Sequence, residues 1–302
     1  MAPIEPYAVK AVLSTLAYFS VFKHPLRYDE LQSHSHFDVL SKNQLNQVLQ
    51  IAIGSNVIKQ SGSYYILGDK SEILRRTIGE ENAHQAMQKA EKFSEIISQF
   101  PFVKGVALSG SISKGYMDAD SDVDYFIITA PGKLWICRTL LILYKKIILL
   151  NSRKFFCLNY FVDENNLAIP DQNIFTATEI VFLKTMYGPE AMNSFFKANE
   201  WIFNFYPSAK IDVSAKQIAK PWISTFAEKI CSTWLCNIFE VTLRKVTVLF
   251  WRIKFGKRTP EWHQAQMRNK AGVSKHHPNG FQVKVMEAHE QILQSCLEKL
   301  SL

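Results

Sequence analysis

Residues 107–129, ALSGSISKGYMDADSDVDYFIIT, contain the side chains of this chain whose types and spacing best suit chemistry. Gly110 and Ser111 follow an apolar run. A glycine there lets backbone N–H groups and a hydroxyl approach a phosphate, because no side chain blocks the approach. Acidic residues then follow at alternate positions, and they are Asp118, Asp120, Asp122 and Asp124. This combination points to phosphate and metal-ion chemistry.

The last two of these aspartates lead directly into VDYFIIT, an apolar run that predicts a strand. Residues two apart in a strand point to the same side, so Asp122 and Asp124 would project their carboxylates together. Val123 and Tyr125 would face the other way. Two converging carboxylates supply the hard oxygen ligands that Mg²⁺ prefers. An ion held beside a triphosphate stabilises the charge on the oxygen that leaves the α-phosphorus.

Two other interpretations of the acidic segment were considered. A calcium loop of the EF-hand type needs a glycine at its sixth position and a glutamate at its twelfth, and DADSDVDYFIIT has neither. A solvated acidic turn accounts for Asp118 and Asp120. It does not account for Asp122 and Asp124, which run straight into a strand, so we favour a functional site.

Gly110-Ser111, a ten-residue gap and Asp122-Val123-Asp124 before a hydrophobic strand resemble the nucleotidyltransferase superfamily. This superfamily includes DNA polymerase beta and the small bacterial nucleotidyltransferases, and the resemblance covers about residues 80–187. It implies that Gly110, Ser111 and Lys114 hold the triphosphate of an NTP. It also implies that Asp122 and Asp124 ligand Mg²⁺ or Mn²⁺.

The superfamily usually carries a third carboxylate on the following strand, where it helps to hold a second metal ion and deprotonates the acceptor hydroxyl. Here that strand is expected at RKFFCLNYFV, residues 153–162, and its polar position is Asn159. An amide cannot take up a proton, and it binds Mg²⁺ more weakly than a carboxylate. Asn159 would therefore replace the catalytic acid. Either another acid substitutes for it, or the chain binds nucleotide without efficient transfer; the candidates are Asp163, Glu164 and Glu179.

If Asn159 takes the position of the third carboxylate, as the resemblance implies, its side chain should lie on the face of the sheet that carries Asp122 and Asp124. Strand periodicity then sorts the residues of this strand by face. Phe155, Cys157 and Phe161 would share the face of Asn159, and the opposite face would carry Phe156, Leu158, Tyr160 and Val162.

The first part of the chain predicts three helices followed by a β-hairpin, which is the order of a winged helix. The helices are expected at residues 8–20, from about Tyr28, and from an N-cap at Ser41 to Gly54, with the hairpin turn at 61–63. The third helix carries Lys42 and no arginine. Because phosphate contacts supply much of DNA affinity, we favour a scaffold or docking role over sequence-specific DNA binding.

The remaining pattern completes an α+β protein. A charged helix at 71–100 leads to a strand at 102–110, helices are expected at 133–150 and 174–187, and 189–302 is mostly helical. We therefore expect a nucleotidyltransferase-type mixed sheet with flanking helices. The expected domains are a winged-helix-like module at 1–69, a nucleotidyltransferase core with its linking helix at 70–190, and a helical C-terminal region at 191–302.

Composition indicates the kind of partner and the cellular compartment. The 302 residues carry a net charge of +8, which suits a polyanionic partner. The five cysteines are scattered without a Cys-x-x-Cys pair, and no signal peptide is evident, so we expect a reducing cytoplasm. The apolar run 134–150 is too short to span a membrane, and charges interrupt it, so a buried helix is expected. The interrupting residues are Arg138, Lys145 and Lys146.

The basic segment 243–270 could bind nucleic acid, because cations interleaved with aromatic side chains can hold a strand. Its cations are Arg244, Lys245, Arg252, Lys254, Lys257, Arg258, Arg268 and Lys270, and its aromatics are Phe250, Trp251, Phe255 and Trp262. The alternative is an amphipathic helix with buried aromatics and solvated cations. His276 and His277 lie in a Pro-Asn-Gly turn, which favours solvated side chains over a metal site.

The sequence thus predicts a bacterial, cytoplasmic, Mg²⁺-dependent nucleotidyltransferase. It would move NMP from an NTP to a hydroxyl-bearing acceptor (RNA, protein or a small molecule) and release pyrophosphate. A nucleotide-binding regulatory module with weak or no turnover is the first alternative, and Asn159 motivates it. A winged-helix DNA-binding regulator is the second.

Overall fold

An open mixed sheet forms the centre of the molecule. The computed structural model describes residues 5–300 except 153, 217, 232–233, 257–258, 260–266 and 276–280. Within these residues the sheet has the order β7-β4-β5-β6-β9-β8. The strands are β4 (Val103–Ser109), β5 (Asp124–Thr129), β6 (Cys157–Asp163), β7 (Lys184–Tyr187), β8 (Asn269–Lys270) and β9 (Val273–Lys275).

Strand directions follow from the connections between the strands. β4 runs antiparallel to β5 and to β7, whereas β5 runs parallel to β6. Parallel neighbours need a crossover, which the apolar helix α6 (Leu134–Ile147) provides. α6 packs on the sheet, and Trp135 and Leu141 are fully buried there. This confirms the buried helix expected at this run, although the helix ends at Ile147.

Two hydrophobic clusters cover the two faces of the sheet. Tyr125 and Ile127 of β5 belong to one cluster, with α4 (Ser71–Ser98), α6 and α10 (Trp234–Phe255). Phe126 and Ile128 belong to the other, with α7 (Ile174–Val181), α8 (Pro189–Lys197) and α12 (Phe281–Lys299). The alternation along β5 explains how one apolar run supplies both faces.

The N-terminal module contains the helices and hairpin that the sequence predicts. Its helices are α1 (Pro6–Val21), α2 (Tyr28–Ser33) and α3 (Lys42–Gly54). Ser41 caps α3 by accepting the Gln44 backbone N–H, as expected for an N-cap. β1 (Leu26–Arg27), β2 (Lys59–Ser61) and β3 (Tyr64–Ile66) form a small sheet in the order β1-β3-β2. That this module is a winged helix stays a prediction, as do the three domain boundaries.

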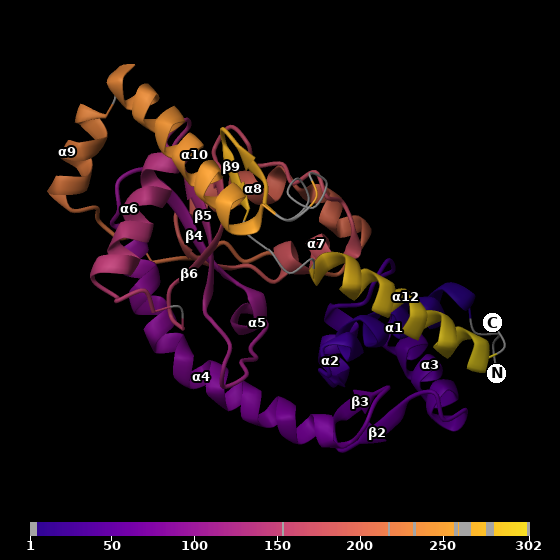
Figure 1. Ribbon diagram of the computed structural model, residues 1–302. Coiled ribbons are helices and arrows are strands. Elements are labelled where there is room, and N and C mark those ends of the chain that lie inside the picture. Colours follow the sequence, from indigo (N-terminus) through magenta and orange to yellow (C-terminus); the bar gives the residue numbers. More distant parts are fainter. Residues whose placement is uncertain are drawn as a thin grey trace.

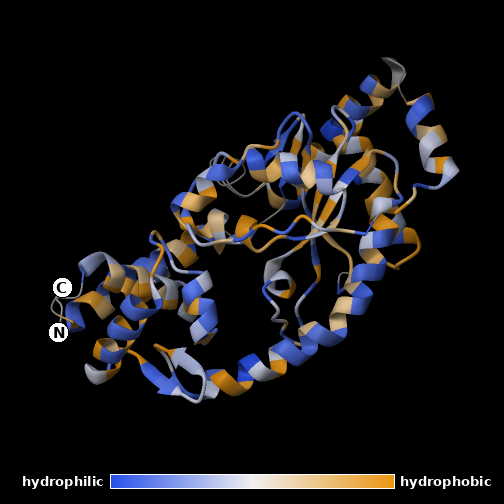
Figure 2. Cartoon of the chain, turned by 180° about the vertical axis from the view of Figure 1, so that it is seen from behind, coloured by the Kyte–Doolittle hydropathy of each residue, from blue (hydrophilic) through white to orange (hydrophobic). Residues whose placement is uncertain are grey.

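The two ends of the chain come together in this module. Figure 1 shows α12, in yellow, lying along α1, while the long helix α4 leads away from the module towards the sheet. In Figure 2 α4 is mostly hydrophilic, as its charged sequence requires. α12 therefore connects the far end of the chain back to the first helix.

A buried polar network holds α12 against α1. The Ser14 hydroxyl lies 2.9 Å from His36 Nδ1 and 3.2 Å from His289 Nε2, and His36 Nε2 lies 3.0 Å from the Tyr206 hydroxyl. Tyr206 follows the short 3₁₀-helix η1 (Glu200–Asn204). Because buried polar groups need hydrogen-bond partners, this network fixes the relative position of three distant segments.

Two expectations about the secondary structure were wrong. The helix expected at 174–187 ends at Val181, and Lys184–Tyr187 form β7 instead. The outer edge of β4 would otherwise present unpaired N–H and C=O groups, which β7 satisfies. β8 and β9 lie in the region expected to be mostly helical, and β9 pairs with the exposed edge of β6 for the same reason.

The face assignment along β6 was also wrong in part. The register with β5 shifts between Tyr125 and Phe126, which pair with Leu158 and Tyr160, so Asn159 is an extra residue in β6. Leu158 and Phe161 consequently pack in the same cluster, whereas Val162 packs on the other face. Strict alternation cannot foresee a bulge. β6 itself begins at Cys157 rather than at residue 153.

In the described parts of the chain, every helix is too short or too polar to cross a membrane.

The buried histidines predict an acid-sensitive fold. Burial holds the pKa of His36 and of His289 below the ordinary value near 6.5. Both are then neutral in the folded state, and the unfolded chain binds more protons as pH falls below about 6.5. We expect the free energy of unfolding to fall between pH 7 and 5, by at most about 1.4 kcal/mol per pH unit for each group. His289→Gln should flatten this dependence in urea titrations, and His84→Gln, at an exposed position, should not.

Candidate active site

The pairing of β4 with β5 brings the Gly-Ser segment next to the aspartates. Ser109, the last residue of β4, pairs with Asp124, the first residue of β5. The chain turns immediately after Ser109 into the short helix α5 (Gly110–Ser113). Residues that the sequence separates by a loop therefore meet at one end of the sheet.

Only a glycine fits at position 110. Gly110 has a φ of +70°, in the left-handed region, and a Cβ there would lie 2.7 Å from Asp124 Oδ2. A side chain would be strained and would also push the carboxylate away. The sequence predicts that Gly110 leaves the backbone open to a phosphate. The structure adds a second reason for a glycine here, which is the space taken by the Asp124 carboxylate.

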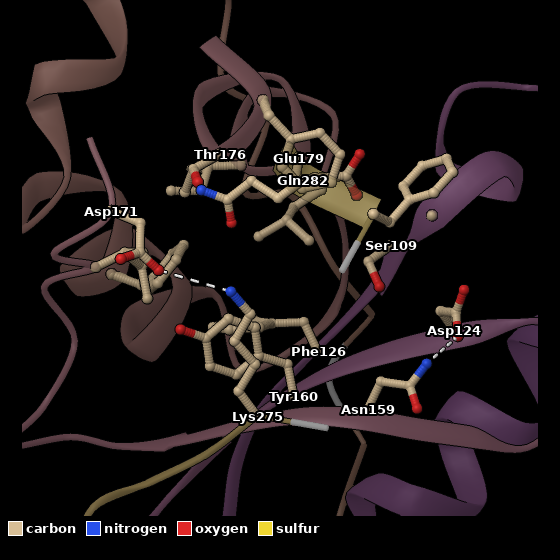
Figure 3. A pocket seen from close by; sticks show the side chains of 17 residues that line it. Ser109, Asp124, Phe126, Asn159, Tyr160, Asp171, Thr176, Glu179, Lys275 and Gln282 are labelled. Atoms are coloured by element: carbon tan, nitrogen blue, oxygen red, sulfur yellow. Dashed lines mark hydrogen bonds and ion pairs between the residues drawn. The ribbon is translucent and has the colours of Figure 1, made fainter. Parts of the chain in front are cut away.

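Asn159 lies beside Asp124, as expected for a residue in the position of the third carboxylate. Its Nδ2 donates a hydrogen bond of 2.7 Å to Asp124 Oδ1, and Figure 3 shows the two side chains facing each other. The bulge in β6 places the amide there, one residue out of step with the rest of the strand. The amide fixes the orientation of the carboxylate.

The environment of Asp124 opposes its charge. Burial raises the pKa of Asp124 to about 6, and the nearby carboxylates of Glu179 and Asp122 add to the shift. A hydrogen bond from Cys157 and the charge of Lys114 act in the opposite direction. A bound cation would relieve this cost, because it stabilises the ionised form.

Lys114 is paired with an acid within the site. Its Nζ lies 2.8 Å from Glu179 Oε1 and 3.0 Å from the Gly110 carbonyl oxygen. Glu179 projects from α7, and both side chains are half-buried. Lys114 is therefore held over the Gly-Ser turn by an acid from the helical half of the domain.

Of the three acids considered as substitutes for the missing carboxylate, the structure brings only Glu179 near Asp124. Asp163 is buried at the end of β6, where its carboxylate accepts hydrogen bonds from the backbone N–H groups of Gly132 and Asn165. Glu164 is exposed beyond the end of β6. Asp163 thus has a structural task, and Glu164 lies outside the site.

Asp118 and Asp120 have different surroundings from Asp122 and Asp124. Asp118 lies 2.6 Å from Arg75 of α4 and accepts a short hydrogen bond from Tyr116, and these partners lower its pKa against the effect of burial. Asp120 is exposed. The first anchors the loop to α4 and the second is a solvated turn residue, as the acidic-turn interpretation held for this part.

A cavity of about 140 Å³ opens beside the Gly-Ser turn, and we call it the Gly-Ser pocket. Figure 3 shows Ser109, Asp124, Asn159 and Glu179 on one side of it and Asp171 with Lys275 on the other. Asp171 holds this far end together through Arg268 Nη2 at 2.9 Å and Lys275 Nζ at 3.6 Å.

Of the two serines that flank Gly110, Ser109 lines this pocket, whereas Ser111, which the sequence predicts as a site residue, lies half-buried in α5. Ser109 precedes the glycine directly, so the sequence carried a signal for it. Asp171 and Lys275 had no such signal, because they reach the pocket from a loop and from β9.

A second cavity, of about 850 Å³, lies on the other side of Asn159, and we call it the basic pocket. Asp122 and Asn159 line one end of it. Its cations come from α6 and α10, and they are Arg138, Lys145, Lys146 and Lys254. Asn159 lines both pockets, so the end of β6 separates two recesses that meet near the aspartates.

The polar groups fit a divalent cation that shares its ligands with a substrate. Among the described residues, no three His, Cys, Asp or Glu side chains come together as a complete metal site. Asp122 and Asp124 offer carboxylate oxygens and Asn159 an amide oxygen. Mg²⁺ commonly takes one or two carboxylates and completes its coordination with water and phosphate oxygens.

The described residues of the basic segment 243–270 lie in different parts of the structure. Its first cations lie on α10, where Trp251 is buried but Phe250 is exposed, and Arg268 pairs with Asp171 near the Gly-Ser pocket. The remaining residues named there lie outside the described residues, and they are Lys257, Arg258, Trp262, His276 and His277.

Comparison with known proteins agrees with this geometry. Residues 90–170 match the family model described as a nucleotidyltransferase domain. The chain therefore carries a domain of the nucleotidyltransferase superfamily, and its α+β mixed sheet with flanking helices is consistent with that fold. The match supports nucleotidyl transfer in general, with a nucleotide as a substrate. No curated protein and no solved structure matches the chain.

We expect Gly110→Ala to reduce stability and metal binding by more than the strain of an alanine at a positive φ accounts for. Gly115 has the same φ of +70°, but a Cβ there meets nothing within 4 Å. Gly115→Ala should cost about 1 kcal/mol in urea unfolding through strain alone. Gly110→Ala should cost more and also weaken Mn²⁺ binding in calorimetry, because its Cβ displaces the Asp124 carboxylate. Equal effects of the two substitutions on Mn²⁺ affinity would contradict this geometry.

Asp124→Asn should stabilise the metal-free protein at high pH. With a folded pKa of about 6 against an ordinary value of 3.8, Asp124 reduces stability fully above pH 6, and this cost declines between pH 6 and pH 4 and is absent below. The amide removes it and can still accept the Asn159 hydrogen bond. In EDTA we expect a gain of about 1–3 kcal/mol at pH 8 and none near pH 4. Asp120→Asn, at an exposed position, should show no such difference.

Proposed function

We propose that this protein is a Mg²⁺-dependent nucleotidyltransferase that moves NMP from an NTP to a hydroxyl-bearing acceptor and releases pyrophosphate. The contact between Gly110 and Asp124 carries the proposal. It sets an unobstructed backbone, suited to phosphate, directly against a half-buried carboxylate whose raised pKa a cation would relieve.

The Gly-Ser pocket would receive the nucleotide. The backbone at Ser109 and Gly110 approaches without a side chain in the way, and the Ser109 hydroxyl adds a donor on the same wall. Lys114 lies above this turn and contributes positive charge, and Glu179 holds it in place. Ser111 lies in α5 and does not line the pocket, so it would support the position of the turn and not contact the nucleotide from the pocket wall.

Asp122 and Asp124 would hold the metal ion, Mg²⁺ or Mn²⁺. When bound, the ion would neutralise the triphosphate and stabilise charge on the leaving oxygen. Asn159 would keep Asp124 aimed at the ion through its 2.7 Å hydrogen bond. An amide accepts no proton at neutral pH, so Asn159 is a positioning residue rather than a base. Glu179 is engaged by Lys114, and the acceptor proton would pass to solvent at the open end of the basic pocket.

A nucleotide-binding module without turnover is the second candidate, and Asn159 again favours it. Its Nδ2 donates to Asp124 where a third carboxylate would share a metal ion, so a second ion would find fewer negative ligands. Binding would survive this change better than catalysis, because transfer also requires the acceptor hydroxyl to lose its proton.

Asp122→Ala with Asp124→Ala should abolish metal-dependent nucleotide binding while the fold survives. Both acids lie at the start of a strand, outside the apolar clusters. Loss of two charged ligands should weaken Mg²⁺-NTP binding at least ~100-fold in calorimetry. The matched control is Asp120→Ala with Glu164→Ala, which removes the same charge from exposed positions. An unchanged NTP affinity of the first variant would refute the site.

Pyrophosphate release separates the two candidates. The wild-type chain is incubated with each NTP, Mg²⁺ or Mn²⁺, and a panel of acceptors (RNA, protein and small hydroxyl compounds). Release above the level of the double aspartate variant supports the enzyme. Tight NTP binding without release supports the module.

A further inference from the structure

Arg138 is a buried cation on the wall of the basic pocket that lacks an anionic partner in the described part of the chain. It is only 9% exposed, and it takes part in no ion pair or hydrogen bond there. Its guanidinium lies 5.0 Å from the ring centre of Trp251 and 5.8 Å from that of Trp135. Burial lowers the pKa of Arg138 to about 10, which still leaves it charged at neutral pH.

A second buried arginine shows what such a residue ordinarily requires. Arg76 is 2% exposed, and its guanidinium pairs with Glu80 at 2.9 Å and with Glu30. A buried charge without a partner reduces stability, and an apolar side chain of similar volume would serve the fold as well or better. Packing between two tryptophans offsets only part of that cost. Arg138 is thus better explained by a ligand than by folding.

The surroundings of Arg138 indicate an anionic ligand. Lys145 and Lys146 of α6 and Lys254 of α10 line the same pocket. Asp122 is the one carboxylate among its described lining residues, and it lies at the end where the aspartates and Asn159 are found. The pocket therefore carries net positive charge and opens onto the reaction centre proposed above.

Resting on the proposed nucleotidyl transfer, we propose that the basic pocket binds the acceptor, and that this acceptor carries a phosphate group held by Arg138. The planar guanidinium fork matches a phosphate in a bidentate manner, and Lys146 and Lys254 add positive charge on the same wall. A single terminal phosphate can reach a buried guanidinium. A nucleic-acid strand would need exposed aromatics beside the guanidinium on which to stack. Phe250 and Phe281 are exposed in this pocket, but Trp251, whose ring lies 5.0 Å from the guanidinium, is buried.

In this arrangement the two substrates enter from opposite sides of Asn159. The acceptor hydroxyl oxygen attacks the α-phosphorus of the NTP and forms the new O–P bond. The bond from the α-phosphorus to the bridging oxygen breaks, and pyrophosphate leaves with the electron pair. The hydroxyl proton passes to solvent. The product is a phosphate-bearing molecule with NMP attached to its former hydroxyl.

Inorganic phosphate tests the binding step without any assumption about turnover. Calorimetry is run on the metal-free full chain. Arg138→Met should weaken phosphate binding at least 10-fold, and Arg252→Met, at an exposed position of α10 outside the pocket lining, should leave it unchanged. Urea unfolding should show Arg138→Met to be as stable as wild type or more stable. Should it not fold, Arg138→Gln replaces it. Equal phosphate affinities of wild type and the Arg138 variant, or no binding by wild type, overturn the proposal.

Transfer from α-labelled NTP tests the acceptor class and its source. One arm offers soluble phosphate esters (glycerol phosphate, sugar phosphates and nucleoside monophosphates), each beside its unphosphorylated counterpart. A second arm offers vesicles of phosphatidylcholine containing phosphatidylinositol phosphate. Label on phosphate esters, lost at least 10-fold in Arg138→Met and retained in Arg252→Met, supports the proposal, and the arm that is labelled identifies the source. Equal label on unphosphorylated compounds, or label on RNA alone, overturns it.

The two experiments fail separately. If the chain binds no NTP, the proposed nucleotidyl transfer fails, and with it the acceptor role, while the phosphate titration still decides whether Arg138 forms an anion site. If NTP binds and is turned over but Arg138→Met keeps full activity with phosphate-bearing acceptors, the proposed function stands and the acceptor assignment falls.

Discussion

The close approach of Gly110 to Asp124 is the constraint on which the site depends. It exists because the end of β4 pairs with the start of β5, and it leaves no room for a Cβ at position 110. The same pairing sets the turn after β4 beside the carboxylate of Asp124. The sheet register thus brings together the backbone that we propose for phosphate and the acid that we propose for the metal ion.

The fold tolerates electrostatic cost at this place. Asp124 is held where burial and two neighbouring acids disfavour its charge, β6 carries a bulge at Asn159, and Lys114 is drawn to Glu179 across the turn. Arg138 adds a buried cation on the other side. Such features reduce stability unless a ligand compensates for them, and their concentration at one end of the sheet is typical of active sites.

The helix α12 connects this end of the sheet with the N-terminal module. Its first residue, Phe281, lines both the Gly-Ser pocket and the basic pocket, and its later residue His289 joins the buried network with Ser14. The N-terminal module thus contacts the wall of the site through α12, in addition to the long helix α4 and to direct contacts such as that of His36 with Tyr206.

The sequence by itself predicted most of the elements around the site and its candidate residues. The apolar runs 102–110 and 124–129, the charged helix after residue 70, the cap at Ser41 and the Gly-Ser and aspartate segments are local signals, because each depends on neighbours a few residues away. The placement of Asn159 beside Asp124 was implied by the family resemblance and not by a local pattern. The candidate acids for the role of a third carboxylate could be named from the sequence but not ranked, since their distance from Asp124 depends on where α7 and the turn after β6 lie in space.

Only the tertiary structure decided the rest. β7 and β9 form because the open edges of β4 and β6 need partners. The local sequence of a segment carries no information about which strand edge will lie beside it in the fold. The bulge at Asn159 arises from register against β5, which period-two alternation cannot express. In the sequence, Arg138 is a charge that interrupts an apolar helix. In the fold, α6 packs beside α10 and Arg138 lies on the wall of the basic pocket, where no carboxylate of the described residues pairs with it.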